Sequence, residues 1–141
     1  MSEVAAVSSY EQREALAKRF HACLLARDWN GIRLLVHDDA NWVLPGDNLI
    51  SGPAVGGDAV VERAKLIASF GVSFQLLHIL VSRDHVALAL RNMATRPGAV
   101  LDEYLATVCR LRGDRIIEIE TYLSDVRGMN RFFSKAPEHI S

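Results

Sequence analysis

The sequence lacks the features that would assign a function directly. Its formal net charge is only −1, so a basic surface for nucleic acid or for an anionic membrane is not indicated. No apolar run approaches the ~18–20 residues of a membrane-spanning helix. Charged residues from Glu3 onward leave no room for the apolar core of a signal peptide. We therefore expect a cytoplasmic protein that binds neither nucleic acid nor membrane.

Cysteines and metal-binding patterns are also scarce. The two cysteines, Cys23 and Cys109, do not have the close spacing of metal ligands, so reduced thiols are the simplest interpretation. The acidic pairs Asp38-Asp39 and Asp47-Asn48 fall in expected turns, where such residues are common without a metal. Neither a metal nor a cofactor is expected. Internal repeats, low-complexity tracts and linkers are lacking too, so residues 1–141 are expected to form one domain.

The first half of the chain has helical periodicity. Ser8-Ser9-Tyr10-Glu11 has the form of a capping box and precedes a helix over residues 9–27. Asp28 or Asn30 is a suitable N-cap for a short second helix that carries Ile32, Leu35 and Val36.

A strand ending at Leu44 and a glycine-rich loop over residues 51–57 separate these helices from a third one. Asp58 is its expected N-cap and Gly71 its expected end.

From Val72 onward the period changes to that of strands. Three long strands are expected over Val72–Val81, His85–Thr95 and Val100–Leu111. The turn Arg112-Gly113-Asp114-Arg115 then leads into a fourth. Helices followed by an antiparallel meander predict an α+β fold in which helices cover one face of a curved sheet.

The end of the last strand is the best clue to function. Its residues alternate, so Ile117, Ile119, Thr121 and Leu123 share one face, and Asp125 falls on the same side. A carboxylate at the end of an apolar stripe needs water, a partner or a ligand pocket. The alternative is that Asp125 caps a helix formed by the tail over residues 126–133.

The order of elements resembles a known family. It is carried by GIRLLVHDDANWVLPG, SGPAVGGDAVV, LDEYLATVCRLRGDRI and IETYLSDVRGMNRFF. Together they are similar to the SnoaL-like branch of the NTF2-like superfamily, over about residues 8–133. The resemblance implies a cone of curved antiparallel sheet, with three N-terminal helices covering its concave face around a pocket. That fold hosts several chemistries and some members that only bind.

Steroid isomerases of this superfamily use a tyrosine, a carboxylate base and a protonated aspartic acid. The resemblance places these groups on Phe20, Leu44 and Thr107 of this sequence. Two hydrocarbons and a hydroxyl cannot remove an α-proton and hold an enolate as those groups do. Conventional ketosteroid isomerase activity is therefore not expected.

Two other family chemistries stay open. Limonene-type epoxide hydrolases hold a water between two carboxylates joined by an arginine; Arg91 and Asp125 match in part, but Met93 stands where an acid is needed. Polyketide cyclases need an apolar pocket and one aspartic acid near the end of the last strand, which Asp125 matches. The resemblance thus implies a cyclase or isomerase in which Asp125 is the acid–base, with Arg91 and Thr107 beside it.

The expected pocket binds a small hydrophobic, oxygenated molecule of polyketide or terpenoid type. Beside the catalytic candidates, its expected substrate-binding residues are Phe20, Trp42, Leu44, His78, Met93, Thr121 and Leu123. His78 could instead be a core residue, and Arg91 could lie exposed on the outer face. A homodimer is expected through the convex face that bears Ile116 and Tyr122. A non-catalytic binding protein or a dimeric scaffold is the alternative function.

Overall fold

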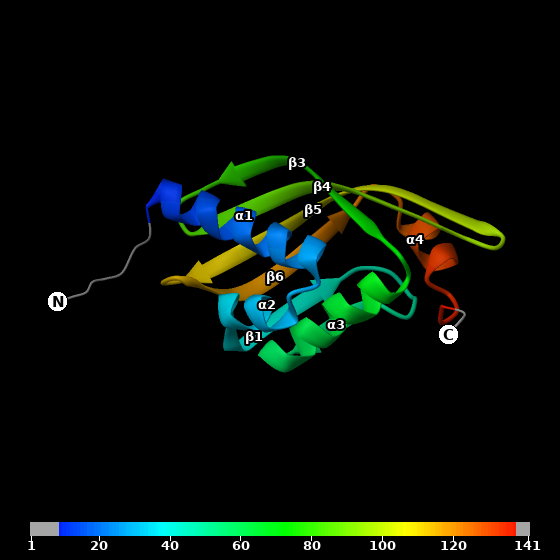
Figure 1. Cartoon of the computed structure of the whole chain (residues 1–141), viewed down its shortest axis with the longest axis horizontal. Helices are drawn as coiled ribbons and strands as arrows, with labels where there is room; N and C mark the ends of the chain where they lie inside the picture. Colours follow the sequence, from blue (N-terminus) through cyan, green and yellow to red (C-terminus); the bar gives the residue numbers. More distant parts are fainter. Residues whose placement is uncertain (1–8, 138–141) are drawn as a thin grey trace.

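The computed structural model describes residues 9–137 and has an α+β fold, in which helices cover one face of a curved six-stranded sheet (Figure 1). The helices are α1 Tyr10–Ala26, α2 Trp29–Leu35, α3 Gly57–Ser69 and α4 Val126–Phe132. The strands are β1 Val36–Leu44, β2 Gly52–Val55, β3 Ser73–Val81, β4 His85–Arg96, β5 Ala99–Arg112 and β6 Arg115–Leu123. Their order in the sheet is β2-β1-β6-β5-β4-β3.

Helix α1 begins at a capping box, one residue later than the sequence suggested. The Ser9 side chain accepts a hydrogen bond from the Gln12 backbone N–H at 3.0 Å, and the Gln12 side chain accepts from the Ser9 N–H at 2.7 Å. Ser8, the expected cap, lies outside the described residues. The apolar side of the helix, with Leu16 and Phe20 buried, packs across β3 and β4 as the helical spacing predicted.

The starts of the next two helices differ in chemistry. Asp28 caps α2 by accepting from the Gly31 N–H at 2.9 Å, as expected. Asp58, by contrast, does not cap α3, whose N-cap is Gly56 at a φ of 98°. Asp58 lies in the first turn and accepts from Arg33 Nε at 2.8 Å, while Arg33 Nη2 donates to Asp38 at 2.7 Å. Asp38, expected in a turn, lies within β1.

The sheet contains one strand and one pairing that were not expected. Residues 52–55, interpreted as loop, form the short edge strand β2, where Pro53 is tolerated because an edge strand has unpaired N–H positions. Strand β1 pairs with β6 in parallel, whereas the other neighbours are antiparallel. The hairpin between β5 and β6 turns at Gly113, whose φ is 65°, as predicted.

An irregularity in the β5–β6 ladder places Ile116 in the core cluster, where the strand alternation had placed Ile117. The register shifts between Arg110 and Leu111, so both Ile116 and Ile117 are buried. Ile116 is 0% exposed, whereas Tyr122 is 55% exposed on the outer face. The expectation that these two residues share the convex face is therefore wrong.

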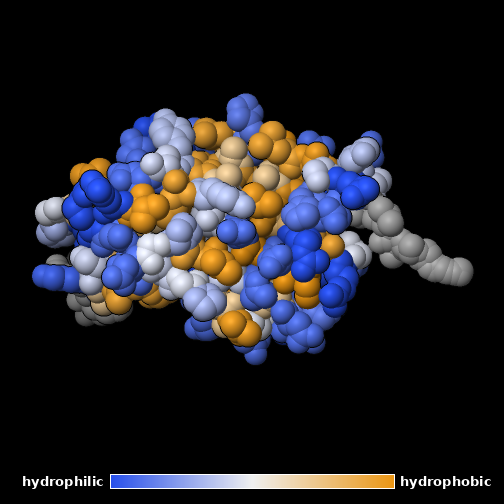
Figure 2. Space-filling view, turned by 180° about the vertical axis from the view of Figure 1, so that it is seen from behind, coloured by the Kyte–Doolittle hydropathy of each residue, from blue (hydrophilic) through white to orange (hydrophobic). Residues whose placement is uncertain are grey.

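The outer face of the sheet carries an apolar surface without any helix over it. Seen from behind, hydrophobic side chains gather over the strands (Figure 2). Small and apolar residues of neighbouring strands pair with one another on this face and alternate along each strand with residues of the inner face. We define the outer apolar patch as Leu80, Ala87, Ala89, Ala106, Val108 and Tyr122.

Two further findings concern membranes and metals. Within residues 9–137, no helix is long and apolar enough to cross a membrane. In the same part of the chain, no three histidine, cysteine, aspartate or glutamate side chains are grouped so that they could hold a metal ion. Cys109 is fully buried, and burial raises the pKa of its thiol to about 12, so this cysteine acts as a small apolar core residue.

Candidate binding cavity

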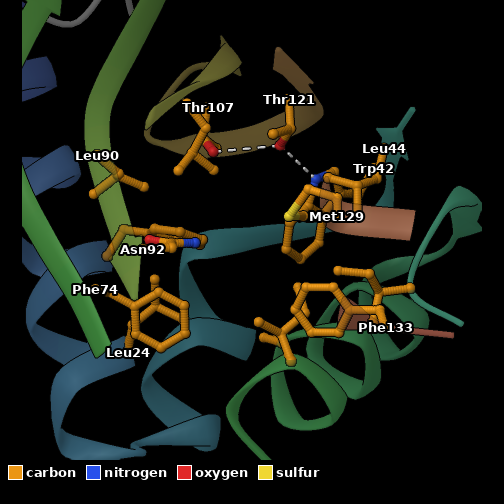
Figure 3. A pocket seen from close by; sticks show the side chains of 15 residues that line it. Leu24, Trp42, Leu44, Phe74, Leu90, Asn92, Thr107, Thr121, Met129 and Phe133 are labelled. Carbon is orange, nitrogen blue, oxygen red and sulfur yellow. Dashed lines mark hydrogen bonds between the residues drawn. The ribbon is translucent and has the colours of Figure 1, made fainter. Parts of the chain in front are cut away.

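A cavity lies between the inner face of the sheet and the helices that cover it (Figure 3). Its volume of about 40 Å³ is small; at ~10–15 Å³ for each water molecule it has room for roughly three. A larger ligand therefore requires side chains of the wall to move. The lining residues are Phe20, Leu24, Trp42, Leu44, Ile50, Ala64, Ile67, Phe74, Leu90, Asn92, Leu105, Thr107, Thr121, Met129 and Phe133.

The wall combines hydrocarbon with a few neutral polar groups. Helices α1, α3 and α4 contribute apolar side chains only, and the polar groups come from the sheet. They are the indole N–H of Trp42, the amide of Asn92 and the hydroxyls of Thr107 and Thr121. All the lining side chains are neutral, which is the composition of a site for an uncharged small molecule.

Three of these polar groups form a chain. Trp42 Nε1 donates to Thr121 Oγ1 at 3.0 Å, and the two threonine oxygens are 3.3 Å apart (Figure 3). The contact between the threonines uses one of their two hydroxyl protons, and the indole can only donate. One hydroxyl proton of the pair therefore remains available to donate to an oxygen of a ligand.

Asn92 is the fourth polar group and projects from β4 into the cavity (Figure 3). It is only 7% exposed, and its Oδ1 atom has no hydrogen-bond partner among the described residues. A buried polar atom without a partner costs ~1–3 kcal/mol. Such an atom in a cavity wall is a candidate contact for a ligand.

The structure places five of the expected pocket residues on the cavity wall. They are Phe20, Trp42, Leu44, Thr107 and Thr121. Trp42 and Leu44 lie two positions apart in β1 and are both buried, so the expected register of this strand is confirmed.

Asp125 does not lie in the cavity. Its carboxylate is exposed and caps α4, accepting from the Gly128 N–H at 2.9 Å. Strand β6 ends at Leu123, so the strand alternation no longer applies at Asp125. The helix cap, weighed as the alternative, is the position that the structure shows, and the expectation that Asp125 faces the pocket is corrected.

Arg91 also lies outside the cavity, on the outer face of β4. Its Nε and Nη2 atoms donate to the two carboxylate oxygens of Asp102 at 2.8 and 2.9 Å, and its guanidinium lies over the ring of Tyr104. These hydrogen bonds raise the pKa of Arg91 and lower the pKa of Asp102. An ion pair with Asp125 is thereby excluded in this arrangement, because Arg91 is held by another carboxylate.

Three further expected residues do not line the cavity. Met93 is two positions from Arg91 and shares its outer face. His78 is exposed, because a bulge between Leu76 and His78 turns it outward. Leu123 is half-buried at the end of β6 and packs against the core without reaching the cavity.

Sequence reasoning missed Asn92 and Glu103, which are buried polar residues of the sheet. The signal for Asn92 was present, since Val86, Leu88 and Leu90 alternate along β4 and continue the inner face to position 92. Glu103 stands opposite Asn92 in the ladder and is 1% exposed. Its Oε2 accepts from Ser124 Oγ at 2.9 Å and from the Asp125 N–H at 2.7 Å. Glu103 thus fixes the corner between β6 and α4.

Comparisons with known proteins agree with this architecture. Residues 17–119 match the SnoaL-like domain. Bal32a, from a soil-derived mobile gene cassette, is 26% identical with a TM-score of 0.82, covering 88% of this chain and 98% of that one. A putative SnoaL-like polyketide cyclase from Jannaschia sp. CCS1 is 14% identical with a TM-score of 0.72, covering 97% of this chain and 99% of that one.

A third similar structure is that of TerC, co-crystallized with polyporic acid. It is 17% identical with a TM-score of 0.74 and covers 88% of this chain and 99% of that one. No curated protein matches this chain. The likeness to structures below 25% identity is a likeness of fold.

Proposed function

Because the chain belongs to the SnoaL-like domain family, we propose that it binds a small hydrophobic, oxygenated molecule in its cavity and acts on it as a cyclase or isomerase. The observation that carries this proposal is the row of hydrogen bonds from Trp42 through Thr121 to Thr107 in a mostly apolar wall. It offers a hydroxyl proton to a ligand oxygen where water is scarce. A molecule of polyketide or terpenoid type has the required combination of hydrocarbon and oxygen.

The chemistry that this wall supports is orientation and polarisation. Packing against the apolar wall holds one conformation of a flexible substrate, and such orientation can lower a barrier by ~7–11 kcal/mol at best. A hydrogen bond from the threonine pair to a carbonyl draws electron density toward its oxygen. That makes the carbonyl carbon more electrophilic and the neighbouring C–H bonds more acidic.

Two similar proteins are compatible with this class of ligand. TerC was co-crystallized with polyporic acid, a small molecule, and the Jannaschia protein is described as a putative polyketide cyclase. By analogy of fold they favour a small-molecule site in this chain. The wall of this chain supplies its own support, because its lining side chains are apolar or neutral.

Two alternatives make different use of the same cavity. In a protein that only binds, the ligand is held but its bonds are not activated. In an enzyme that uses Asp125 as general acid–base, the carboxylate must leave the N-terminus of α4 and enter the cavity. Polarisation by the threonine pair, binding alone and acid–base catalysis by Asp125 can be told apart with a bound ketone. Each predicts that a different substitution, or none, changes the rate at which the ketone exchanges its α-hydrogens.

We expect this protein to accelerate exchange of the α-hydrogens of cyclohexanone with D₂O, followed by proton NMR. A solvent molecule takes the proton from carbon and returns a deuteron, while the hydroxyl of the threonine pair polarises the carbonyl. The double variant Thr107→Val/Thr121→Val should lose the acceleration, because no hydroxyl is left to polarise the carbonyl. The conservative variant Asp125→Asn should retain it within about twofold, and Thr95→Val, at an exposed threonine, is the matched control.

The other outcomes select between the alternatives. Binding of cyclohexanone without any acceleration would support the non-catalytic protein. Loss of the acceleration in Asp125→Asn would assign the acid–base role to Asp125. No binding of cyclohexanone at millimolar concentration would contradict the proposed site for oxygenated apolar molecules.

We also propose that the chain forms a homodimer through the outer apolar patch. Leu80 and Tyr122 are each more than half exposed there, and the three alanines between them allow close approach of a second backbone. The ion pairs Arg91–Asp102 and Arg110–Glu118 also project from the outer face. Charges of both signs around an apolar centre suit a self-complementary interface.

A further inference from the structure

The unpartnered oxygen of Asn92 defines one more requirement on the ligand. Asn92 is only 7% exposed, and its side chain points into the cavity (Figure 3). Oδ1 has no partner among residues 9–137. An amide oxygen can only accept, so the missing partner must be a donor.

The side chains around Asn92 cannot supply that donor. Leu90 and Ala94, its neighbours on the same face of β4, are hydrocarbons. Glu103, opposite in the ladder, accepts hydrogen bonds from Ser124 and from the Asp125 N–H through Oε2 and makes no hydrogen bond to Asn92 Oδ1. The cavity side is therefore where a donor can approach Oδ1.

Asn92 and the threonine pair lie at different ends of the cavity wall. Thr107 stands opposite Leu88 in the ladder, four residues from Asn92 along β4, which is ~13 Å at ~3.3 Å per residue. The pair Leu90 and Leu105 lies between these two positions and lines the cavity. The wall thus has a donor at one end, hydrocarbon in the middle and an acceptor at the other end.

We infer that Asn92 selects ligands that carry a hydroxyl or N–H group, which donates to Asn92 Oδ1 inside the cavity. This inference rests on the proposed function of the cavity as a site for small oxygenated molecules. It adds that an apolar ligand without a donor binds more weakly than its hydroxylated counterpart. An empty acceptor discriminates in this way because it stays unpaired when the wrong ligand displaces water.

Titration with phenol, anisole and toluene, followed by NMR chemical shifts of the protein, tests the inference. The three molecules are similar in size, but phenol donates, anisole only accepts and toluene does neither. We expect phenol to bind about tenfold more tightly than anisole and toluene. In Asn92→Leu the preference should disappear, and toluene should bind at least as well as phenol. Asn30→Leu, at an exposed asparagine, is the matched control and should keep the preference.

The outcomes separate this inference from the proposed function. Equal affinity of the wild-type protein for all three molecules would overturn the role of Asn92 and leave the apolar site intact. Binding of none of them would overturn the site itself. The wild-type comparison needs no variant, so equal affinities would overturn the inference even if Asn92→Leu does not fold.

Discussion

Replacement of Glu103 by alanine is expected to lower the free energy of unfolding by about 3 kcal/mol, measured by urea denaturation. Hydrogen bonds to a charged group contribute ~1.5–3 kcal/mol each, and Glu103 Oε2 accepts two. The variant leaves the Asp125 N–H without its acceptor and creates a space under the start of α4. Since Met129 and Phe133 line the cavity, this corner also positions part of the cavity wall.

Asp125→Ala is the matched control, since Asp125 and Glu103 meet at the same corner. It removes only an exposed N-cap, which is worth about 1 kcal/mol. A loss of stability in Asp125→Ala as large as that in Glu103→Ala would contradict the account. It would show that Asp125 has an interaction beyond the helix cap.

Ala106→Arg is expected to convert a dimer into a monomer, measured by sedimentation at micromolar concentration. Ala106 lies in the middle of the outer apolar patch, opposite Ala89 on one side and Tyr122 on the other. Two copies of a desolvated guanidinium facing each other cost several kcal/mol, which raises the dissociation constant by more than about 100-fold. The two arginine side chains repel each other, and they do not fit into the space that the small side chain of Ala106 leaves for the second copy.

Ala22→Arg provides the control, because Ala22 is exposed on α1 and lies away from the outer face. It should leave the sedimentation coefficient of the dimer unchanged. A wild-type protein that sediments as a monomer at micromolar concentration would refute the proposed dimer without affecting the cavity.

Much of the fold could be predicted because local signals agree with tertiary packing. The spacing of Leu16 and Phe20 gave the buried side of α1, and the turn around Gly113 gave the last hairpin. These elements are long and strongly patterned, so small errors at their ends change little. The short strand β2 was missed because glycine and proline are depleted in strands and only its edge position admits them.

The cavity was predicted less completely, because a shift by one residue reverses every side chain of a strand. In β4 the wrong parity placed Arg91 and Met93 inside, where the structure places Asn92. The bulges between Leu76 and His78 and between Ile116 and Glu118 reverse the alternation within strands, and nothing in the local sequence marks them. Asp125 follows the end of its strand, where a helix cap takes the place of alternation.

The most direct test of the account follows the two indole N–H signals of the protein in NMR spectra while toluene is added. Trp42 lines the cavity and donates to Thr121, whereas Trp29 lies in α2 outside the cavity wall. We predict a saturable shift of the Trp42 signal, assigned with the variant Trp42→Phe, and no comparable shift of the Trp29 signal. A shift of the Trp29 signal alone, or none in either, would contradict the claim that this cavity is the ligand site.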